Sequence, residues 1–558
     1  MSDKDPISEI QIEDQKIFDN KELSIWEALT PVVILMVLLA YNIFFKDGEW
    51  LGGYSNQYIL LIGGLVASIV GFFNRTKLKT MIVEVWENLK SIFIPIMILL
   101  LVGALAGTWL VSGVIPAMVY YGLQVLNPSI FLPASVVIAA IISIATGSSW
   151  TTSATVGIAL IGIGTALGIN SGLIAGAVIS GAYFGDKMSP LSDTTNLAPA
   201  MAGTDLFTHI KYMTYTTVPS IVITLIVFVI FSIIQDSTGA RDVGFIIDKI
   251  DSTFNITPWL FLVPVAVIIL IVLKTKPLLA LSSGVVLAII FAFIFQPTIL
   301  EGLNESKISS SVQSVFTSTT VEVSDEKEKS NFTSEELENI ANYKTLNTLF
   351  NDDDLEDTFS NEELASIFGG TYQTVRIKVD NLQKFIVVKK VKSLFSAGGM
   401  QGMLWTIFLI VCAMVFGGIM DGIGALARIT KSLLSIADSV FGLFASTVVS
   451  CLGLNIVASD QYLALVIPGK MIKKAYEDRG LAPENLSRTL EDSGTVTSVL
   501  IPWNTCGAYQ SGVLGVSVLD YFAYAIFNWL SPFMTLLFAA LNIKIRQLTG
   551  ANSETVSA

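Results

Sequence analysis

The sequence predicts an all-α polytopic membrane protein with two inverted repeats, broken or re-entrant helices and a small soluble insert. Three observations indicate this class. Hydrophobic residues make up 52% of the 558 residues and charged residues only 14%, which is too apolar for a water-soluble fold of this length. Several segments carry the ~20 mainly apolar residues that cross a bilayer. The two apolar halves of the chain also resemble each other in their small residues and acids.

The distribution of charge divides the chain into five parts. They are a polar cytoplasmic tail over 1–24, a first membrane half over 25–300, an acidic soluble insert over 301–395, a second membrane half over 396–545 and a C-terminal tail over 546–558. The net charge of −13 comes mostly from the first tail and the insert, so it indicates no nucleic-acid partner. No basic region leads into a short apolar core at the start, and we expect no cleaved signal peptide.

Uninterrupted apolar segments are the expected membrane spans. They lie near 27–45, 57–74, 91–112, 216–235, 258–273, 277–296, 403–424 and 517–543. Three further apolar stretches, 133–185, 432–469 and 490–514, are interrupted by Gly, Pro, Ser, Thr and acids. Because such residues break a helix where it lines a cavity, we expect broken or re-entrant helices there.

Short loops rich in Lys and Arg predict the orientation, because these residues prefer the cytoplasmic side. Four clusters occur: Arg75, Lys77 and Lys79; Lys274 and Lys276; Lys470, Lys473, Lys474 and Arg479; and Lys544 with Arg546. They predict a multi-pass protein of the bacterial inner (plasma) membrane with both termini in the cytoplasm. Counting spans from the second cluster puts the insert outside.

The insert carries two similar capping motifs, FTSEEL at 332–337 and FSNEEL at 359–364. Each places a Ser or Thr before a Glu as a helix N-terminus does. Apolar and charged residues then alternate over 375–380, a pattern typical of a strand. The sequence therefore favours a small α+β module, with a loosely ordered loop over 303–331 as the alternative.

A shift of 311 residues aligns the two membrane halves. It places Gly107 on Gly418, Gly113 on Gly424, Leu123 on Leu434, Ala134 on Ala445 and Ser148 on Ser459. Each half then continues to an acid-containing break, at Asp186 in the first and at Glu491 and Asp492 in the second. Span counting runs the two copies in opposite directions. Inverted repeats of this kind place a substrate site where the broken helices meet.

The first polar break is the run TGSSWTTS over 146–153, and its repeat counterpart contains Asn455, Ser459 and Asp460. Hydroxyls and freed carbonyls at a helix break can replace part of a cation's water shell, and the carboxylate supplies charge. Alternatively, Ser and Thr bond back to their own helix and permit close packing. We prefer this alternative for Ser135 and Ser446, and the functional one for Ser148 and Ser149 together with Asp460.

The second break is the run GDKMSPLSDTTN over 185–196, in which Pro190 frees carbonyls near Asp186 and Asp193. Its counterpart runs EDSGTVT over 491–497 and then IPWNT over 501–505. An acid, hydroxyls and a proline occur together in both, which favours cation binding. The alternative is simple ion pairing, of Asp186 with Lys187 and of Glu491 with Arg488.

Other candidate groups give weaker evidence of a functional role. His209 is the only histidine, so a histidine-cluster pH sensor is excluded. Cys412, Cys451 and Cys506 lack metal-type spacing and are expected as buried small hydrophobes. Asp421 is equally a helix-end acid or a pathway residue. No phosphate-binding Gly-Lys-Ser/Thr loop occurs, so we expect a secondary transporter without a cofactor, and not an enzyme.

The runs ATGSSWTT at 145–152, GDKMSPLSDTTN at 185–196 and EDSGT at 491–495 closely resemble the NhaC family of bacterial Na⁺/H⁺ antiporters. The resemblance covers about 25–300 and 400–545, and the second motif is specific. It implies Na⁺/H⁺ exchange in pH homeostasis, and some relatives couple malate or lactate exchange to these ions. The insert over 301–395 departs from the family's compact pattern.

These residues support a hypothesis of alternating occupancy, in which one intramembrane carboxylate holds either a proton or Na⁺. We expect Asp193 and Asp460 as core carboxylates and Asp186 with Asp492 as a second pair. The expected neutral ligands are Ser148, Ser149, Thr152, Thr194, Thr195, Asn196, Asn455, Ser459, Thr495 and Asn504. Apart from transported Na⁺ no metal is expected. Li⁺ transport and a homo-oligomer stay open.

Two other functions are also compatible with the sequence. An exchanger of organic acids coupled to the same cations needs a positive group or a helix N-terminus in its core. Lys187 is the only basic residue inside a polar break, which favours transport of cations alone. From a different class, the insert could be a sensor on a membrane anchor. An anchor needs no intramembrane acids, so the paired breaks argue against it.

Overall fold

The computed structural model describes residues 23–46, 49–125, 128–234, 243–273, 275–321, 395–435 and 437–548. Among these residues, eight helices are long and apolar enough to cross a membrane, or nine if one bent pair counts as a span. The described strands are two residues long, β1 (Thr319–Thr320) and β2 (Ser396–Ala397), and they pair with each other. The prediction of an all-α polytopic membrane protein is confirmed.

A helical hairpin of α2 (Ile25–Phe45) and α3 (Ser55–Phe73) opens the described chain. A capping box of Ser24 and Glu27 starts α2. The next span was expected to begin near residue 91, but it includes the amphipathic helix α4 (Leu78–Ser91) and runs from 78 to 111 through α5 (Phe93–Val111). The hydropathy pattern missed this start because charged residues lower the hydropathy of α4.

The first repeat begins with α5 and contains a re-entrant tip, the place near Gly147 where the chain reverses its direction. After α5 the repeat consists of α6 (Val114–Val125), α7 (Pro128–Thr146), α8 (Ser149–Thr152), the π-helical turn η2 (Ser153–Gly157), α9 (Ile158–Ala166), α10 (Ser171–Met188), α11 (Asp193–Ala202) and α12 (Leu206–Ile234). The expected breaks near residues 147 and 190 are both present. Ser148 caps α8 by accepting from Thr151 N, and Ser192 caps α11 by accepting from Thr195 N.

The second repeat has the same order of elements. It consists of α25 (Leu404–Gly422), α26 (Ala425–Ser435), α27 (Val440–Val457), α28 (Gln461–Asp478), α29 (Pro483–Leu490), the π-helical turn η5 (Glu491–Thr495), η6 (Ser498–Leu500), α30 (Thr505–Leu514), α31 (Val518–Phe522) and α32 (Ile526–Ala540). The single span expected over 517–543 is therefore wrong, because the chain breaks between α31 and α32.

The register between the repeats changes before the first break. Gly113 and Gly424, 311 residues apart, both have φ of +79°. Beyond the break the shift is 312 residues: α11 and α30 each have ten residues and end at left-handed Gly203 and Gly515. The change already precedes the breaks, because α7 begins at Pro128 and α27 at Val440, 312 residues later. Gly147 and Ser459, both with positive φ, therefore correspond to each other.

This change corrects two expected pairings. With a shift of 312, Ser148 corresponds to Asp460, and each begins a helix as its N-cap. Asp186 corresponds to Ser498 and not to the acids at 491–492. The acids of the two halves are thus not repeat-related, although the breaks are.

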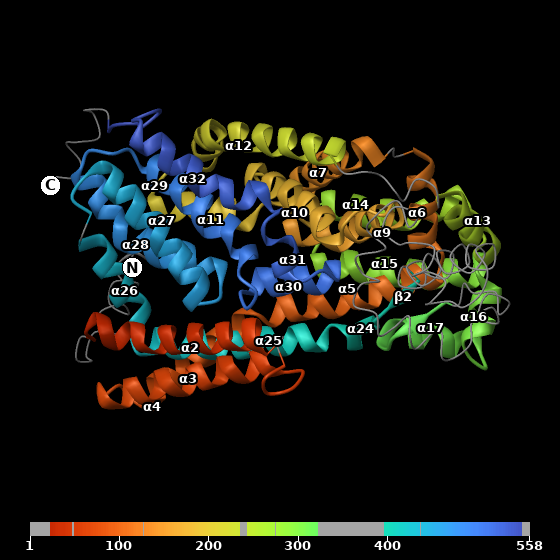
Figure 1. Ribbon diagram of the computed structural model, residues 1–558, viewed down its shortest axis with the longest axis horizontal. Coiled ribbons are helices and arrows are strands. Elements are labelled where there is room, and N and C mark those ends of the chain that lie inside the picture. Colours follow the sequence, from red (N-terminus) through yellow and green to blue (C-terminus); the bar gives the residue numbers. More distant parts are fainter. Residues whose placement is uncertain are drawn as a thin grey trace, which may run out of the picture.

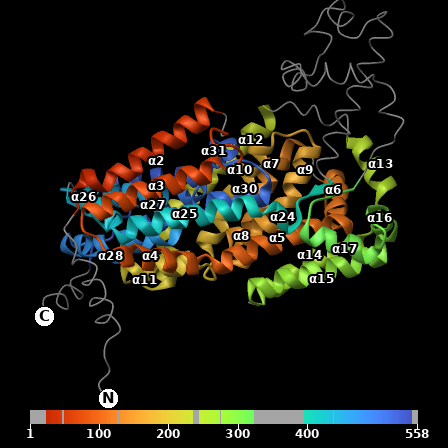
Figure 2. The same cartoon turned by 90° about the horizontal axis from the view of Figure 1, so that it is seen from below.

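The two copies run in opposite directions. In Figure 1, α6 and α26, which follow α5 and α25, lie at opposite ends of the long axis. The packing agrees, because Gly103 of α5 lies against Gly399, just before α25 begins. The same opposition of α6 and α26 is visible in Figure 2. The predicted inverted repeat is therefore present.

Further helices connect the halves. They are α13 (Val243–Thr253), η4 (Pro258–Phe261), α14 (Leu262–Val272), α15 (Pro277–Phe295), α16 (Pro297–Leu303), α17 (Lys307–Phe316) and α24 (Gly399–Gly402). The expected motifs at 332–337, 359–364 and 375–380 lie outside the described residues. Within the described part of the insert, α17 and β1 are ordered elements, unlike the loose loop considered for 303–331.

Basic residues gather at one end of the molecule, where Figure 1 labels α26, α28 and α29. The 75–79 turn lies there because Gly71 contacts both Met81 and Ile423, the residue after α25. The segments 470–479 and 544–546 meet there, since Ala482 N donates to Arg546 O at 3.0 Å. We name this the basic end. The insert joins the chain at the opposite end of α25, beside Gly103.

Close packing by small residues fixes the helices of the first repeat. A Cβ at Gly181 or Gly185 of α10 would overlap a backbone carbonyl of α7. Ser143 Oγ adds a hydrogen bond of 2.6 Å to Ala182 O across the same contact. Small residues allow this approach, and membrane helices rely on it because lipid supplies no hydrophobic driving force between them.

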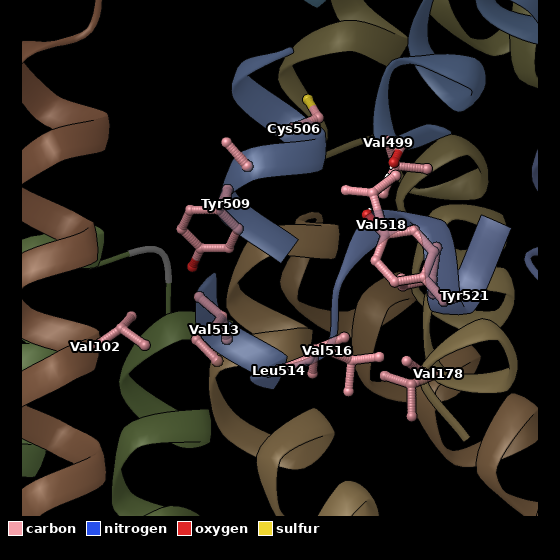
Figure 3. Close-up of a cluster of buried hydrophobic side chains, with 14 of the residues drawn as sticks. Val102, Val178, Val499, Cys506, Tyr509, Val513, Leu514, Val516, Val518 and Tyr521 are labelled. Atoms are coloured by element: carbon pink, nitrogen blue, oxygen red, sulfur yellow. Dashed lines mark hydrogen bonds between the residues drawn. The ribbon is translucent and has the colours of Figure 1, made fainter. Parts of the chain in front are cut away.

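A buried apolar cluster holds α30 in place (Figure 3). Tyr509 and Val513 lie on one face of α30, and Val178 of α10 and Tyr521 of α31 belong to the same cluster. Tyr521 donates a hydrogen bond of 2.9 Å to Val499 O. The start of α30, which carries Thr505, is thereby positioned relative to both repeats.

Candidate functional site

The breaks of the two repeats meet at one cavity of about 750 Å³. Its polar lining comes from both breaks of the first repeat and from the starts of α28 and α30, and includes Thr146, Ser148, Thr151, Asp186, Ser192, Asp193, Thr194, Asp460, Gln461 and Thr505. The α4–α5 junction and the α14–α15 turn complete the wall. Thr275, in the turn between α14 and α15, lines the cavity, whereas the basic clusters at 75–79, 470–479 and 544–546 lie at the basic end.

Asp186 is held by the first re-entrant tip. One of its oxygens accepts from Ser149 N at 3.0 Å and from Ser149 Oγ at 2.7 Å. Ser149 is the first residue of α8, so the carboxylate sits at the positive end of a helix. Asp186 is 9% exposed. The tip, reversed at Gly147 with φ of +68°, therefore supplies two donors to one buried acid.

Asp460 occupies the equivalent tip of the second repeat. Its Oδ1 caps α28 by accepting from Tyr462 N at 2.9 Å and Leu463 N at 3.1 Å. Its Oδ2 lies 3.5 Å from Thr505 Oγ1. The side chain is 7% exposed and lines the cavity. One carboxylate oxygen is thus fixed by the backbone, and the other faces the hydroxyl across the break.

Asp193 differs from these two acids in its exposure. It is the first residue of α11, it lines the cavity, and its side chain is exposed. The adjacent Thr194 Oγ1 donates to Glu491 Oε1 at 3.0 Å. We expected Asp193 to be a core carboxylate, but Asp186 is the more buried partner of Asp460.

Asp492 lies away from the cavity lining. It forms an ion pair with Lys187, and both side chains are fully buried. Thr216 Oγ1 donates to Asp492 Oδ2 at 2.8 Å, and Thr535 Oγ1 also contacts it. Its expected pairing with Asp186 at an ion site is not what the structure shows, because Lys187 compensates Asp492 305 residues away in the chain.

The ion pairs considered as simpler explanations have other partners. Lys187 pairs with Asp492 and not with Asp186. Arg488 packs its guanidinium 4.6 Å from the ring centre of Tyr212, and Glu491 accepts from Thr194. Asp186 therefore stays available at the cavity.

Most of the expected neutral ligands support the breaks instead of lining the cavity. Among them, Ser148 and Thr194 line it, and Ser149 holds Asp186. The others bond mainly to nearby backbone or lie buried behind the lining: Thr152 to Ser148 O, Thr195 to Asp186 O, Asn196 to Pro190 O, Asn455 to Gly494 O and Asn504 to Asn455 O, with Ser459 and Thr495 also buried. Ser135 bonds back to Phe131 O at 2.8 Å, as the packing alternative expected.

Sequence reasoning missed several lining residues. Thr505 corresponds to Asp193 and Gln461 to Ser149 under the shift of 312 residues, so the corrected repeat would have identified both. Trp150 lines the cavity and stacks on Tyr509, with ring centres 4.0 Å apart. No sequence signal pointed to that contact, because it joins residues from the two repeats.

The arrangement offers what a desolvated cation needs: carboxylates, hydroxyls and carbonyls around a space between broken helices. Inverted repeats whose broken helices meet at a polar centre are the architecture of many secondary active transporters.

The comparisons with known proteins identify the family. The model of the Na⁺/H⁺ antiporter family matches residues 181–331 and 354–543. The Na⁺/H⁺ antiporter NhaC of Alkalihalophilus pseudofirmus is 34% identical over 87% of this chain and 90% of that protein. NhaC of Bacillus subtilis is 32% identical over 81% and 84%. The chain belongs to the Na⁺/H⁺ antiporter family, and the resemblance of its motifs to NhaC is confirmed.

A third relative carries a different name. The malate-2H⁺/Na⁺-lactate antiporter of Bacillus subtilis is 30% identical over 92% of this chain and 92% of that protein. Membership of the family thus makes this chain an antiporter of the membrane and leaves a choice among its substrates.

Proposed function

We propose that this protein exchanges Na⁺ for protons across the bacterial inner membrane by competition at Asp186 and Asp460, with Asp193 beside them. The observation that carries the proposal is the meeting of three acids from two inverted repeats at one cavity. The names of the NhaC relatives support Na⁺ and H⁺ as the exchanged ions.

Competition follows from burial. A carboxylate removed from water loses hydration of its charged form, so it holds a proton unless a cation or hydrogen bonds replace the water. Na⁺ can replace it by binding the carboxylate oxygens together with hydroxyls such as those of Ser148, Thr194 and Thr505. Since one site holds either ion but not both, loading one releases the other. This couples the two fluxes.

We further propose that the basic end is cytoplasmic. Three of the four Lys and Arg clusters collect there, as the cytoplasmic loops of membrane proteins do. The insert joins at the opposite end of α25, beside Gly103, and so lies outside the cell. This is also the expectation from span counting.

The organic-acid exchanger is the second candidate, and two observations bear on it. A cavity of about 750 Å³ is of a size that admits a small organic molecule. Among its lining residues, however, no Lys or Arg occurs, and Lys187 is already ion-paired with Asp492. An anion there would meet three carboxylates. Cation exchange is therefore favoured.

Proton flux in everted vesicles tests the proposal. We expect Na⁺ to release protons from the vesicle interior, Asp186→Asn and Asp460→Asn to lower the rate at least tenfold, and Asp193→Asn to act similarly. Asp248→Asn, an exposed acid of α13 outside the cavity, is the matched control. Li⁺, K⁺, malate and lactate are tested in parallel. Exchange that needs malate or lactate would favour the second candidate, and normal exchange by all three variants would refute the site.

A further inference from the structure

A second pocket lies at the basic end, apart from the ion cavity. It has a volume of about 510 Å³ and is lined by Thr208, Lys211, Tyr212, Tyr215, Lys544, Ile545 and Arg546. These residues come from the start of α12 and from the segment after α32. Its lining contains three basic side chains and no acid, so the pocket is built for an anion.

Two of the three basic groups are available for a ligand. Arg546 Nη1 is bonded to Glu484 Oε1 at 2.7 Å, which neutralises it in part. Lys544 Nζ lies 4.9 Å from the ring centre of Tyr215, and in this cation–π contact no acid neutralises its charge. Lys211 is exposed on the first turns of α12. Amines beside tyrosine rings are typical of the membrane interface.

An apolar stripe leads away from this pocket along α12. Lys211, Tyr215, Val218, Val222 and Ile226 are three or four residues apart and therefore share one helix face. The last four are 37%, 47%, 48% and 54% exposed, in that order. A ligand with an anionic head in the pocket could lay an acyl chain on the stripe, which a free anion could not use.

We propose that this pocket binds the phosphate headgroup of an anionic phospholipid, with an acyl chain along α12. Each Lys near the headgroup adds favourable charge interaction with an anionic lipid. A soluble anion would use the amines alone, whereas the stripe selects a ligand held in the bilayer.

The pocket is linked to the core through Tyr212. Its hydroxyl lies 2.7 Å from Asn485 Oδ1 and accepts from Arg546 N at 3.2 Å, and its ring carries the Arg488 guanidinium at 4.6 Å. Arg488 and Asn485 belong to α29, which leads directly into the turn holding Glu491 and Asp492. A bound lipid would therefore hold the segment after α32 against α12 and α29.

Native mass spectrometry of the full chain in detergent tests the proposal. Phosphatidylglycerol, phosphatidylcholine and inorganic phosphate are titrated separately. For Lys211→Ala/Lys544→Ala we expect the dissociation constant of phosphatidylglycerol to rise about 30-fold, roughly fivefold for each lysine. Lys211→Arg/Lys544→Arg, which keeps both charges, should bind as the unaltered protein does. Lys77→Ala/Lys79→Ala removes two exposed charges from the same end and should change little.

Four results would overturn the proposal. They are unchanged binding by the alanine variant, an equal loss in the Lys77 and Lys79 control, equal binding of phosphatidylcholine, and inorganic phosphate binding as tightly as the lipid. The last would indicate a soluble anion. Equal melting temperatures of the variants exclude unfolding as the cause of a loss.

Discussion

Asp186 and Asp460 face the same cavity, but different groups hold them. Asp186 depends on the side chain and backbone of Ser149, whereas Asp460 is bonded to backbone N–H groups of its own helix. A hydrogen bond to a charged group contributes about 1.5–3 kcal/mol, more than one between neutral groups. The first acid is therefore sensitive to a single hydroxyl.

We expect Ser149→Ala to raise the Na⁺ concentration for half-maximal exchange about tenfold, because Asp186 loses one of the two hydrogen bonds that Ser149 donates to it. Vesicle exchange assays at several Na⁺ concentrations measure this. Ser135→Ala is the control, since Ser135 is equally buried and bonds only to its own helix. A similar loss in both variants would mean that Ser149 acts through packing.

The buried ion pair of Lys187 and Asp492 is expected to matter for the stability of the fold. We expect Lys187→Met to destabilise the protein by about 3–5 kcal/mol, because it leaves a buried charge without its partner. Lys187→Met/Asp492→Asn should recover most of this, since the amide can still accept from Thr216 and no charge remains. Thermal unfolding of the purified protein compares the variants. A double variant as unstable as the single one would contradict the explanation.

At the level of elements, the contact of α7 with α10 positions both breaks of the first repeat. The tip at Gly147 ends α7 and Asp186 lies near the end of α10, so a shift between these helices moves the acid relative to Ser149. Glycines make the contact close enough for Ser143 to reach Ala182 O. Packing of two elements thus decides the geometry of one hydrogen bond.

Gly181→Ala is expected to lower both the melting temperature and the exchange rate, because the added methyl group meets the carbonyl of Val136. Gly453→Ala is the matched control in α27, where an added Cβ has nothing within 4 Å. It should be neutral or slightly stabilising, since Ala loses less entropy than Gly in a helix. The two substitutions having equal effects would argue against close packing as the reason.

For the whole molecule, the basic end and the described start of the insert, at α16 and α17, lie at opposite ends of the long axis (Figure 1), and we propose that these ends face opposite sides of the membrane. Lys79→Cys and Glu305→Cys test this with a membrane-impermeant thiol reagent. We expect Glu305→Cys to react in intact cells and Lys79→Cys only in everted vesicles. The native cysteines are buried and should react little. Labelling in the reverse order would invert the proposed orientation.

The sequence alone determined much about this protein. Hydropathy identified an all-α membrane protein, the Gly, Pro and Ser interruptions located both breaks, and three of the acids within them, Asp186, Asp193 and Asp460, line the cavity. These features are local: a helix break or a membrane span depends on about twenty consecutive residues. The resemblance of the motifs to NhaC was confirmed because the same local runs recur in relatives.

Only the tertiary structure decided which acids meet. Asp492 and Asp186 look equivalent in sequence, yet one is paired with Lys187 and the other faces the cavity. Under the register of 312 residues Thr505 corresponds to Asp193, yet its hydroxyl lies 3.5 Å from Asp460 of the other break. The physical reason is that charge compensation and cavity lining depend on contacts between segments about 300 residues apart, which helical spacing within one segment does not specify.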